Sequence, residues 1–298
     1  MVSARPWVPR IAAQPTIEPF PGWFVGAGQS GSFSTRIRKT IWRSLRDPFE
    51  VAWLDGLRLT LYPGNEISRS IFVTGRYEPN EFHALSRFLR PGMTFIDVGA
   101  NMGLYTLFAA KRLQDGGRVV SIEPSQRERA VLQQNIELNQ LPNVTVLPAA
   151  ACEHAGEVEL LVADSQYSGH NTLGDFGYNT PLDHREVVPA ITLDSLLESE
   201  PPERVDVIKM DIEGGELSAL RGAHEILSQH RPALLLELSD RALAYQKATS
   251  AEVLSVLESH GYRVYGFDRQ SGLPVPLQPK DYFDSENVVA LATATVPW

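Results

Sequence analysis

From residue 94 onward, short apolar runs alternate with amphipathic segments, and this alternation limits the fold more than any other feature of the chain. The first run is TFIDVG, and GLYTLFAAKRL after it has the apolar spacing of a helix. Buried strands that alternate with helices of this length are typical of a mainly parallel sheet covered by helices on both faces. Further strands are predicted at RVVSIEP, VTVLPAA, EVELLVA, VDVIKMD, PALLLELS, YRVYGFD and NVVALAT.

The chain ahead of this pattern is organised differently. Residues 1–34 are rich in proline and glycine and show little periodicity, which predicts an irregular arm. VAWLDGLRLTLYP predicts a β-hairpin, because Asp55-Gly56 suits a type I′ turn between alternating strands. We therefore expect two parts: an N-terminal arm, basic helix and β-hairpin over residues 1–75, and an α/β domain over residues 76–298.

One N-terminal segment, TRIRKTIWRSLR at residues 35–46, holds five basic residues and no acid. Ile37, Ile41 and Leu45 recur in it at helical spacing. The segment predicts a short helix that docks this apolar edge on the main domain. Contact with an anionic partner or a membrane surface is the alternative use of such charge.

Composition narrows the class of protein. The formal net charge is −9, from 36 acids and 27 bases. An acidic surface repels phosphate backbones, so no nucleic-acid partner is predicted. The first 20 residues lack the apolar run of a secretory signal, and no stretch reaches the roughly 20 apolar residues of a membrane helix. With one cysteine, Cys152, and therefore no internal disulfide, the chain is predicted to be soluble and cytoplasmic.

The turn FIDVGANMGLYT joins the first strand to the first helix, at the edge where open α/β sheets bind ligands. Its glycines do not have the G-x-G-x-x-G spacing of a dinucleotide site. Asp97 lies two residues before Gly99, where a carboxylate would repel a pyrophosphate. The same carboxylate suits a ligand that carries an ammonium and a sulfonium. The turn therefore favours S-adenosylmethionine over a nicotinamide dinucleotide.

A second acid, Glu123, ends the next predicted strand. A carboxylate there can accept hydrogen bonds from both ribose hydroxyls of an adenosine cofactor. The alternative is a surface acid that caps the following helix. Ser125 with Glu128 three residues later already predicts a capping box for that helix. Asp97 and Glu123 together therefore favour an adenosine cofactor.

Five motifs together resemble the FkbM-type S-adenosylmethionine-dependent methyltransferases: GRYEPNE, FIDVGANMGLYT, SIEPS, VPAITLDSLL and VDVIKMDIEGGELSALRGA. The likeness runs from about residue 75 to residue 293, and the last motif is the most specific. It implies a Rossmann-like methyltransferase sheet of seven strands, mainly parallel, with the last strand antiparallel. It also implies a methyltransferase domain over residues 76–298 that moves a methyl group to a hydroxyl of a sugar, glycan or natural-product acceptor.

Carried onto this sequence, the resemblance places one group of residues at the cofactor. The glycine turn would line the methionine end, Glu123 and its neighbour the ribose, and the run at residues 149–152 the adenine. No Asp or Asn stands in that run to read the adenine amino group. Two residues of GRYEP would close over the cofactor. The expected residues are Tyr77, Glu78, Asp97, Gly99, Ala100, Asn101, Gly103, Glu123, Pro124 and Ala150.

The stretch VIKMDIEGGE leads an apolar strand into a group of charges. If the strand continues, Lys209, Asp211 and Glu213 alternate onto one face. The implied architecture places them on one side of the transferred methyl, with Glu237 at the end of the next strand on the other. An aliphatic hydroxyl needs a base to take its proton. We predict Asp211 or Glu237 as that base, with Asp211 preferred, and Glu213 as the residue that orients acceptor or cofactor.

Two other interpretations of these charged residues are open. Lys209 could form a purely structural ion pair with Asp211 or Glu213. Alternatively, Asp211 and Glu237 could hold a divalent ion that lowers the pKa of the acceptor hydroxyl, although Lys209 would compete with the ion. The sequence does not decide whether a metal is used.

A polar segment at residues 164–186 is long for a loop in an α/β domain, and loops of this length usually shape a binding site. It supplies His170 and His184 as alternative bases. Cys152 follows a different strand and is expected to be a buried residue without a chemical role.

Rival functions remain at this point. An amine methyltransferase usually grips its flat substrate with an Asn/Asp-Pro-Pro-aromatic turn, which KMDIEGGE lacks. A methyltransferase of a lipid acceptor is a further alternative. A nicotinamide-dependent oxidoreductase disagrees with the glycine spacing and with Asp97. A non-catalytic protein that binds cofactor or partner is the last alternative.

Overall fold

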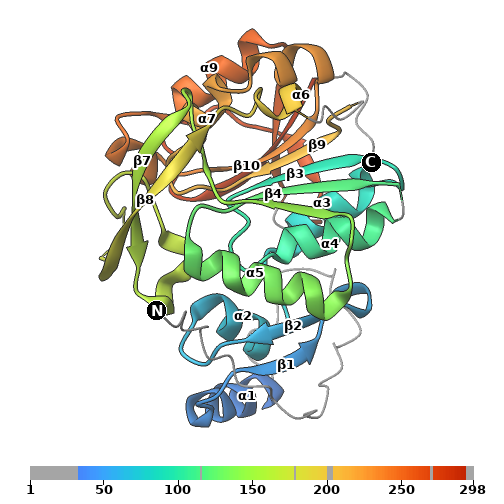
Figure 1. Cartoon of the computed structure of the whole chain (residues 1–298), viewed down its shortest axis with the longest axis vertical. Helices are drawn as coiled ribbons and strands as arrows, with labels where there is room; N and C mark the ends of the chain where they lie inside the picture. Colours follow the sequence, from blue (N-terminus) through green and yellow to red (C-terminus); the bar gives the residue numbers. More distant parts are fainter. Residues whose placement is uncertain (1–32, 115, 178, 200–203, 269–270, 293–298) are drawn as a thin grey trace, which may run out of the picture.

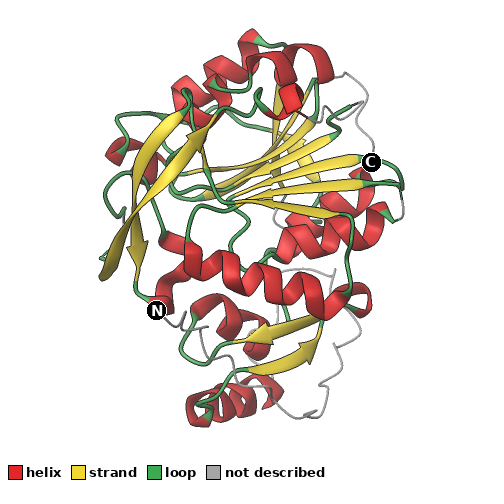
Figure 2. Ribbon diagram, viewed as in Figure 1, coloured by secondary structure: helices red, strands yellow, loops and turns green. Residues whose placement is uncertain are grey.

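The computed structural model describes residues 33–292, apart from 115, 178, 200–203 and 269–270. Its centre is one eight-stranded sheet with helices on both faces (Figure 2). The irregular arm predicted for residues 1–34 lies almost entirely outside the described residues. In spatial order the strands are β12 (Pro274–Pro276), β11 (Arg263–Phe267), β13 (Glu286–Leu291), β10 (Ala233–Leu238), β9 (Val207–Met210), β3 (Thr94–Val98), β4 (Arg118–Ile122) and β5 (Val144–Leu147).

The strand directions confirm the predicted seven-stranded methyltransferase sheet. Strands β5, β4, β3, β9 and β10 are parallel, and β13 lies antiparallel between β10 and β11. The eighth strand, β12, is a three-residue addition paired antiparallel with β11 at the edge of the sheet. Proline lacks a backbone N–H and is tolerated at sheet edges, which fits Pro274 and Pro276 there.

One predicted strand of the alternating pattern is not in the central sheet. EVELLVA forms β7 (Gly156–Ala163), which pairs antiparallel with β8 (Leu182–Ile191). The two-residue β6 (Ala150–Ala151) completes this separate three-stranded sheet. The prediction of a simple alternation of strands and helices was therefore wrong here, because an apolar run does not reveal which strand it will pair with.

Alternate residues of the central strands pack into two different cores. Phe95 and Val207 lie in one core, and the adjoining Ile96 and Ile208 lie in the other. This alternation is what a strand covered on both faces requires. The first core includes α3 (Pro79–Phe88), α4 (Leu104–Leu113) and α5 (Gln126–Asn139), and the second includes α6 (Leu196–Ser199), α7 (Glu216–Arg221), α8 (Asp240–Tyr245) and α9 (Ser250–Ser259).

The predicted β-hairpin is present, formed by β1 (Phe49–Ala52) and β2 (Arg58–Leu61). Asp55 and Gly56 both have positive φ, 55° and 77°, as a type I′ turn requires. Together with α1 (Phe33–Ser44) and α2 (Glu66–Thr74), the hairpin packs at one end of the molecule (Figure 1). The first core includes side chains from both sides of residue 75. The domain boundary predicted at that residue stays a prediction.

The apolar edge predicted for the basic segment does not dock as expected. Ile37 and Ile41 are each 43% exposed, and Leu45 is only half-buried. Among residues 35–44 of α1, Trp42 is instead the one that is buried, and it packs against Phe72. The prediction was wrong because it used helical spacing alone. The larger ring of Trp42, on another side of the helix, makes the contact with the protein that was expected of the isoleucines. Within the described ranges, no helix combines the length and apolar character that a membrane span needs.

Candidate active site

The glycine turn after β3 brings two loops into direct contact. Gly99 has φ of +76°, and a Cβ atom placed on it would lie 2.1 Å from the backbone oxygen of Asp211. No larger residue fits at that distance. Asn101 also has positive φ, and Gly103, with φ of 94°, precedes the first turn of α4. The backbone of this turn is therefore held against the loop that follows β9.

Asp97 lies within β3 and is fully buried. The hydroxyl of Thr106 donates to its Oδ2 at 2.6 Å. Its Oδ1 has no hydrogen-bond partner within the described part of the chain. Burial raises the pKa of Asp97, and the nearby Lys209 opposes that rise. Asp97 therefore keeps one buried acceptor without a donor among the described residues, and it lines neither of the two cavities of the site.

Glu123 follows β4 and is held by backbone donors. Its Oε2 accepts the N–H of Asn101 at 2.8 Å, and its Oε1 accepts the N–H of Ser125 at 2.9 Å. Burial, reinforced by the charge of Glu128, raises the pKa of Glu123 to about 7. The predicted capping box is not formed, because the Ser125 hydroxyl donates to the Glu128 carboxylate instead of accepting a backbone N–H.

A narrow cavity of about 60 Å³ lies between the ends of β3 and β4 and the segment after β7; we call it the first cavity. Its predicted lining residues are Gly99, Asn101, Glu123, Pro124 and Ala150. Ala100 faces a different cavity, and neither Gly103 nor Asp97 lines this one. The opposite wall comes from the long segment that was expected to shape a binding site, although its residues were not assigned to the cofactor. It consists of Ser168, Gly169, Asn171, Thr172 and Leu173.

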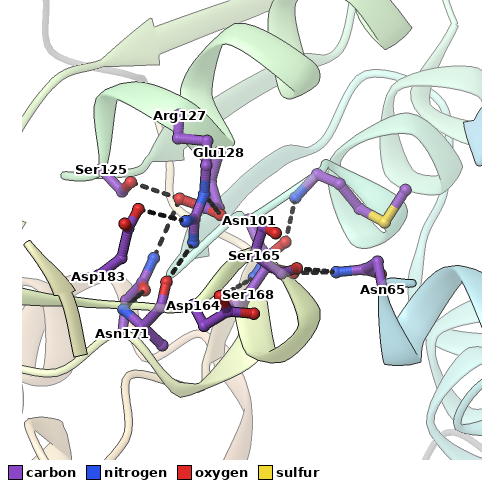
Figure 3. Close-up of polar contacts among 12 residues, drawn as sticks. Asn65, Asn101, Ser125, Arg127, Glu128, Asp164, Ser165, Ser168, Asn171 and Asp183 are labelled. Atoms are coloured by element: carbon purple, nitrogen blue, oxygen red, sulfur yellow. Dashed lines mark hydrogen bonds and ion pairs between the residues drawn. The ribbon is translucent and has the colours of Figure 1, made fainter. Parts of the chain in front are cut away.

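Part of that opposite wall, Ser168 and Gly169, belongs to η2 (Ser165–His170), a segment that side-chain amides hold in place (Figure 3). The amide of Asn65 donates to the Ser168 hydroxyl at 2.7 Å and to the Ser165 carbonyl at 3.0 Å. The amide of Asn101 donates to the Ser168 carbonyl at 2.7 Å. Only the length of the loop signalled this role, since the tie to Asn65 spans about a hundred residues of sequence.

The same segment is fixed to the start of α5. The amide of Asn171 donates to Glu128 at 3.1 Å, and the guanidinium of Arg127 donates to Glu128 at 2.8 Å (Figure 3). Arg127 also contacts Asp183 at 3.3 Å. The wall of the first cavity is thus tied to three other parts of the chain: α2, the glycine turn and α5.

A wider cavity, of about 330 Å³, opens next to the first one; we call it the second cavity. Acids dominate its charged lining, with Lys209 and His170 as the basic groups. The phenol rings of Tyr77 and Tyr105 also line it. Gly99, Asn101, Gly169, Asp211 and Glu213 line both cavities, so the two adjoin there. The lining acids are Glu66, Glu78, Asp211, Glu213 and Glu237.

Strand β9 ends at Met210, so the predicted alternation of charges on one strand face is wrong beyond Lys209. Glu213 has φ of 49°, a left-handed conformation that no strand contains. The chain turns after Met210, and this turn brings the acids together by a different route. Lys209 itself is 5% exposed, and its Nζ lies 3.3 Å from Oδ2 of Asp211.

Lys209 is surrounded by groups that favour its charged form. Its Nζ lies 4.8 Å from the centre of the Tyr105 ring and donates to the Gly99 carbonyl at 3.4 Å. Burial acts to lower the pKa of Lys209, but the carboxylates of Asp211, Asp97 and Glu78 raise it above its ordinary value. A charged lysine therefore stands beside the acid preferred as the base.

Asp211, Glu213 and Glu237 converge although they come from two different strand ends. One carboxylate oxygen from each lies within 4.8 Å of the others. Burial raises the pKa of Glu213 well above its ordinary value, and the charges of Glu237 and Asp211 add to that rise. Burial and Asp211 raise the pKa of Glu237 in the same direction. Grouped carboxylate oxygens of this kind suit a proton, an ammonium or a hard divalent cation.

Glu78 contributes an acid from the other side of the second cavity. Its backbone is left-handed, with φ of 42°, and its carboxylate accepts the Tyr105 hydroxyl. Burial, with the charge of Asp211, raises the pKa of Glu78 to about 8. Tyr77 and Glu78 therefore line the second cavity together with Gly99 and Asn101 of the glycine turn, and their predicted contact with the cofactor stays a prediction.

The remaining candidates, His170, His184 and Cys152, differ in whether they line a cavity. His170 lines the second cavity, with Nε2 3.3 Å from Glu66, and burial lowers its pKa. His184 is exposed on β8 beside Asp183 and lines neither cavity. Cys152 is buried, burial raises its thiol pKa, and it also lines neither.

Comparison with known proteins gives a family for the chain. Residues 97–264 match the model of the methyltransferase FkbM domain. The protein named Methyltransferase 1 from Beauveria bassiana is 27% identical over 217 residues, which cover 66% of this chain and 80% of that protein.

Two further matches cover less of the compared protein. A ribosomal protein L11 methyltransferase from Chloroflexus aurantiacus is 27% identical over 123 residues, 41% of this chain and 33% of that protein. The crystal structure of a methyltransferase FkbM from Methylobacillus flagellatus is 19% identical, with a TM-score of 0.41. That match covers 74% of this chain and 52% of the solved one, so this chain spans about half of its length.

Proposed function

The chain belongs to the FkbM family of methyltransferases, and on that premise we propose that it moves the methyl group of S-adenosylmethionine to a hydroxyl oxygen of a sugar, glycan or natural-product acceptor. The observation that supports this proposal is the junction of the two cavities at Gly99, Asp211 and Glu213. A cofactor in the first cavity and an acceptor in the second would meet beside the acids.

The residues of the first cavity fit the chemistry of the cofactor. Glu123 is anchored by two backbone N–H groups, and its remaining lone pairs can accept ribose hydroxyls. When bound, S-adenosylmethionine supplies an electrophilic methyl group on a positively charged sulfur. Glu213, which lines both cavities, would stabilise that positive charge.

We assign the proton transfer to Asp211. Its carboxylate would take the proton of the acceptor hydroxyl, whose oxygen would then accept the methyl group that the cofactor supplies. Lys209, 3.3 Å away, holds the carboxylate in orientation. Glu213 and Glu237 would bind neighbouring hydroxyls and so fix the acceptor for in-line attack.

A divalent ion is the second candidate for how these acids act. The proximity of Asp211, Glu213 and Glu237, within 4.8 Å, is the observation that favours it. Such an ion would lower the pKa of the acceptor hydroxyl. The ammonium of Lys209 next to Asp211 opposes a second cation, so we propose the metal-free role first.

Two measurements test the proposal. Calorimetric titration with S-adenosylmethionine should show saturable binding, and labelled methyl should move to alcohols in a screen of sugars, glycolipids and natural-product alcohols. Absence of binding at millimolar cofactor would overturn the cofactor assignment. Transfer only to amines would overturn the hydroxyl acceptor while leaving the methyltransferase function intact.

A further inference from the structure

In the described part of helix α1, Trp42 and Arg38 fix the helix to the body of the protein. The Trp42 ring lies 5.6 Å from the ring of Phe72 and 6.4 Å from that of Phe49. Arg38, on the same side of the helix, donates to the Phe72 carbonyl at 3.4 Å. These contacts determine which side of α1 faces the protein.

As a result of these contacts, two isoleucines of α1 face away from the protein. Ile37 and Ile41 are one helical turn apart and each is 43% exposed. Other large apolar side chains that are exposed in the described ranges, such as Val187 and Tyr245, lie on separate elements. Ile37 and Ile41 therefore form a small, partly exposed apolar patch on α1.

Basic residues occupy other solvent-exposed positions around α1. Arg36, Lys39 and Arg43 are exposed, and no ion pair involves them among the described residues. The whole chain carries a net charge of −9, so this concentration of positive charge runs against its average. Helix α1 also lies at the outer end of the molecule, away from the central sheet (Figure 1).

We propose that α1 docks the protein on an anionic lipid bilayer. Charge complementarity selects the partner: the bases would contact acidic lipid head groups while Ile37 and Ile41 enter the boundary with the acyl chains. The helix lies flat on the surface and does not span it. With only two isoleucines buried, the attachment is reversible and sensitive to salt. This proposal adds to the methyl transfer and does not depend on it.

The test is sedimentation of the full chain with vesicles of phosphatidylcholine alone or of an equal mixture with phosphatidylserine. We expect binding to the mixed vesicles only. Replacing Arg36, Lys39 and Arg43 with Gln together should weaken it about a hundredfold, since each base near the surface contributes about fivefold. The double change Ile37→Ser and Ile41→Ser should weaken it severalfold.

Matched control variants lose side chains of the same kinds at positions outside α1. Lys111, Lys247 and Arg263 are exposed, and replacing all three with Gln removes the same charge without touching α1. Val187→Ser with Val275→Ser removes exposed apolar side chains from other strands. Neither control should change vesicle binding. Equal binding to both vesicle types, no binding to either, or equal loss in helix and control variants would overturn the proposal, as would capture of RNA in preference to the mixed vesicles.

Discussion

The acids of the two cavities are held in different ways. Glu123, beside the first cavity, has both carboxylate oxygens fixed by backbone N–H groups at 2.8 and 2.9 Å. Glu213 and Glu237, in the second cavity, approach each other and Asp211 within 4.8 Å, and repulsion between them contributes to their raised pKa values. The first arrangement fixes a carboxylate so that it can orient a ligand. The second leaves carboxylates free to exchange a proton or to bind a positive group.

The largest expected effect comes from the second arrangement. Asp211→Asn keeps the shape of the side chain but cannot take a proton, so turnover should fall about 10²- to 10⁴-fold while cofactor affinity stays within a few fold. Labelled-methyl transfer and calorimetric titration measure the two quantities. Asp281→Asn, an exposed acid, is the control. Retained turnover in Asp211→Asn would move the base to Glu237 or His170.

Glu123→Gln tests the first arrangement. The backbone N–H groups of Asn101 and Ser125 both donate to this side chain. In the variant, the NH₂ end of the carboxamide must therefore face one of these two donors. Losing a hydrogen bond to a charged group costs roughly 1.5–3 kcal/mol, so the cofactor Kd should rise about 10- to 100-fold. Calorimetric titration beside Glu157→Gln, an exposed acid, checks this. An unchanged Kd would remove Glu123 from the cofactor site.

The pH dependence of stability tests the raised pKa of Glu123, the acid that backbone N–H groups hold in place. The pKa of Glu123 rises from 4.5 to about 7 on folding, so between these values the folded state binds more protons than the unfolded state. The free energy of unfolding of the ligand-free protein should therefore fall as pH rises from 4.5 to 7, by on the order of 2 kcal/mol from this group.

Urea denaturation at pH 5 and pH 8 measures that fall. Glu123→Gln should reduce the difference between the two pH values, because its carboxamide does not titrate. Glu78 and Glu216, whose pKa values burial raises to about 8 and about 7, contribute in the same direction and will remain in the variant. A difference as large in Glu123→Gln as in the unchanged chain would contradict the assignment.

The smallest expected effect is that of a chelator. If Asp211 acts as a base beside Lys209, removing divalent ions should leave turnover within about twofold of its starting value. Turnover measured with EDTA, and then with excess Mg²⁺, checks this. Loss with EDTA that Mg²⁺ restores would support the second candidate, a metal held by the three carboxylates.

Periodicity in the sequence was enough to predict the central sheet, because Phe95 and Ile96, or Val207 and Ile208, belong to cores on opposite faces. It could not separate β7 from that sheet, since pairing between distant strands depends on contacts that no short run encodes. The predicted burial of Ile37 and Ile41 was wrong for a related reason. Helical spacing shows that these residues lie along one side of the helix, but the ring of Trp42 determines which side is buried.

The candidate site was predictable in part. Glycine spacing and strand ends located Gly99, Glu123 and Asp211 near one another. The left-handed backbone of Glu213 could not be read from its residue type, because glutamate rarely adopts it. The wall residue Ser168 was not assigned to the cofactor because an amide about a hundred residues earlier, that of Asn65, holds it.

The contact between Gly99 and the Asp211 carbonyl limits how the enzyme can be redesigned. Because a Cβ at Gly99 would lie 2.1 Å from that carbonyl, the two loops share one boundary and neither can be reshaped alone. Changes that retarget the acceptor should therefore avoid the turn after β9. Glu66 and Ile67 on α2 line the second cavity without lining the first, so changes that retarget the acceptor are better placed on this helix.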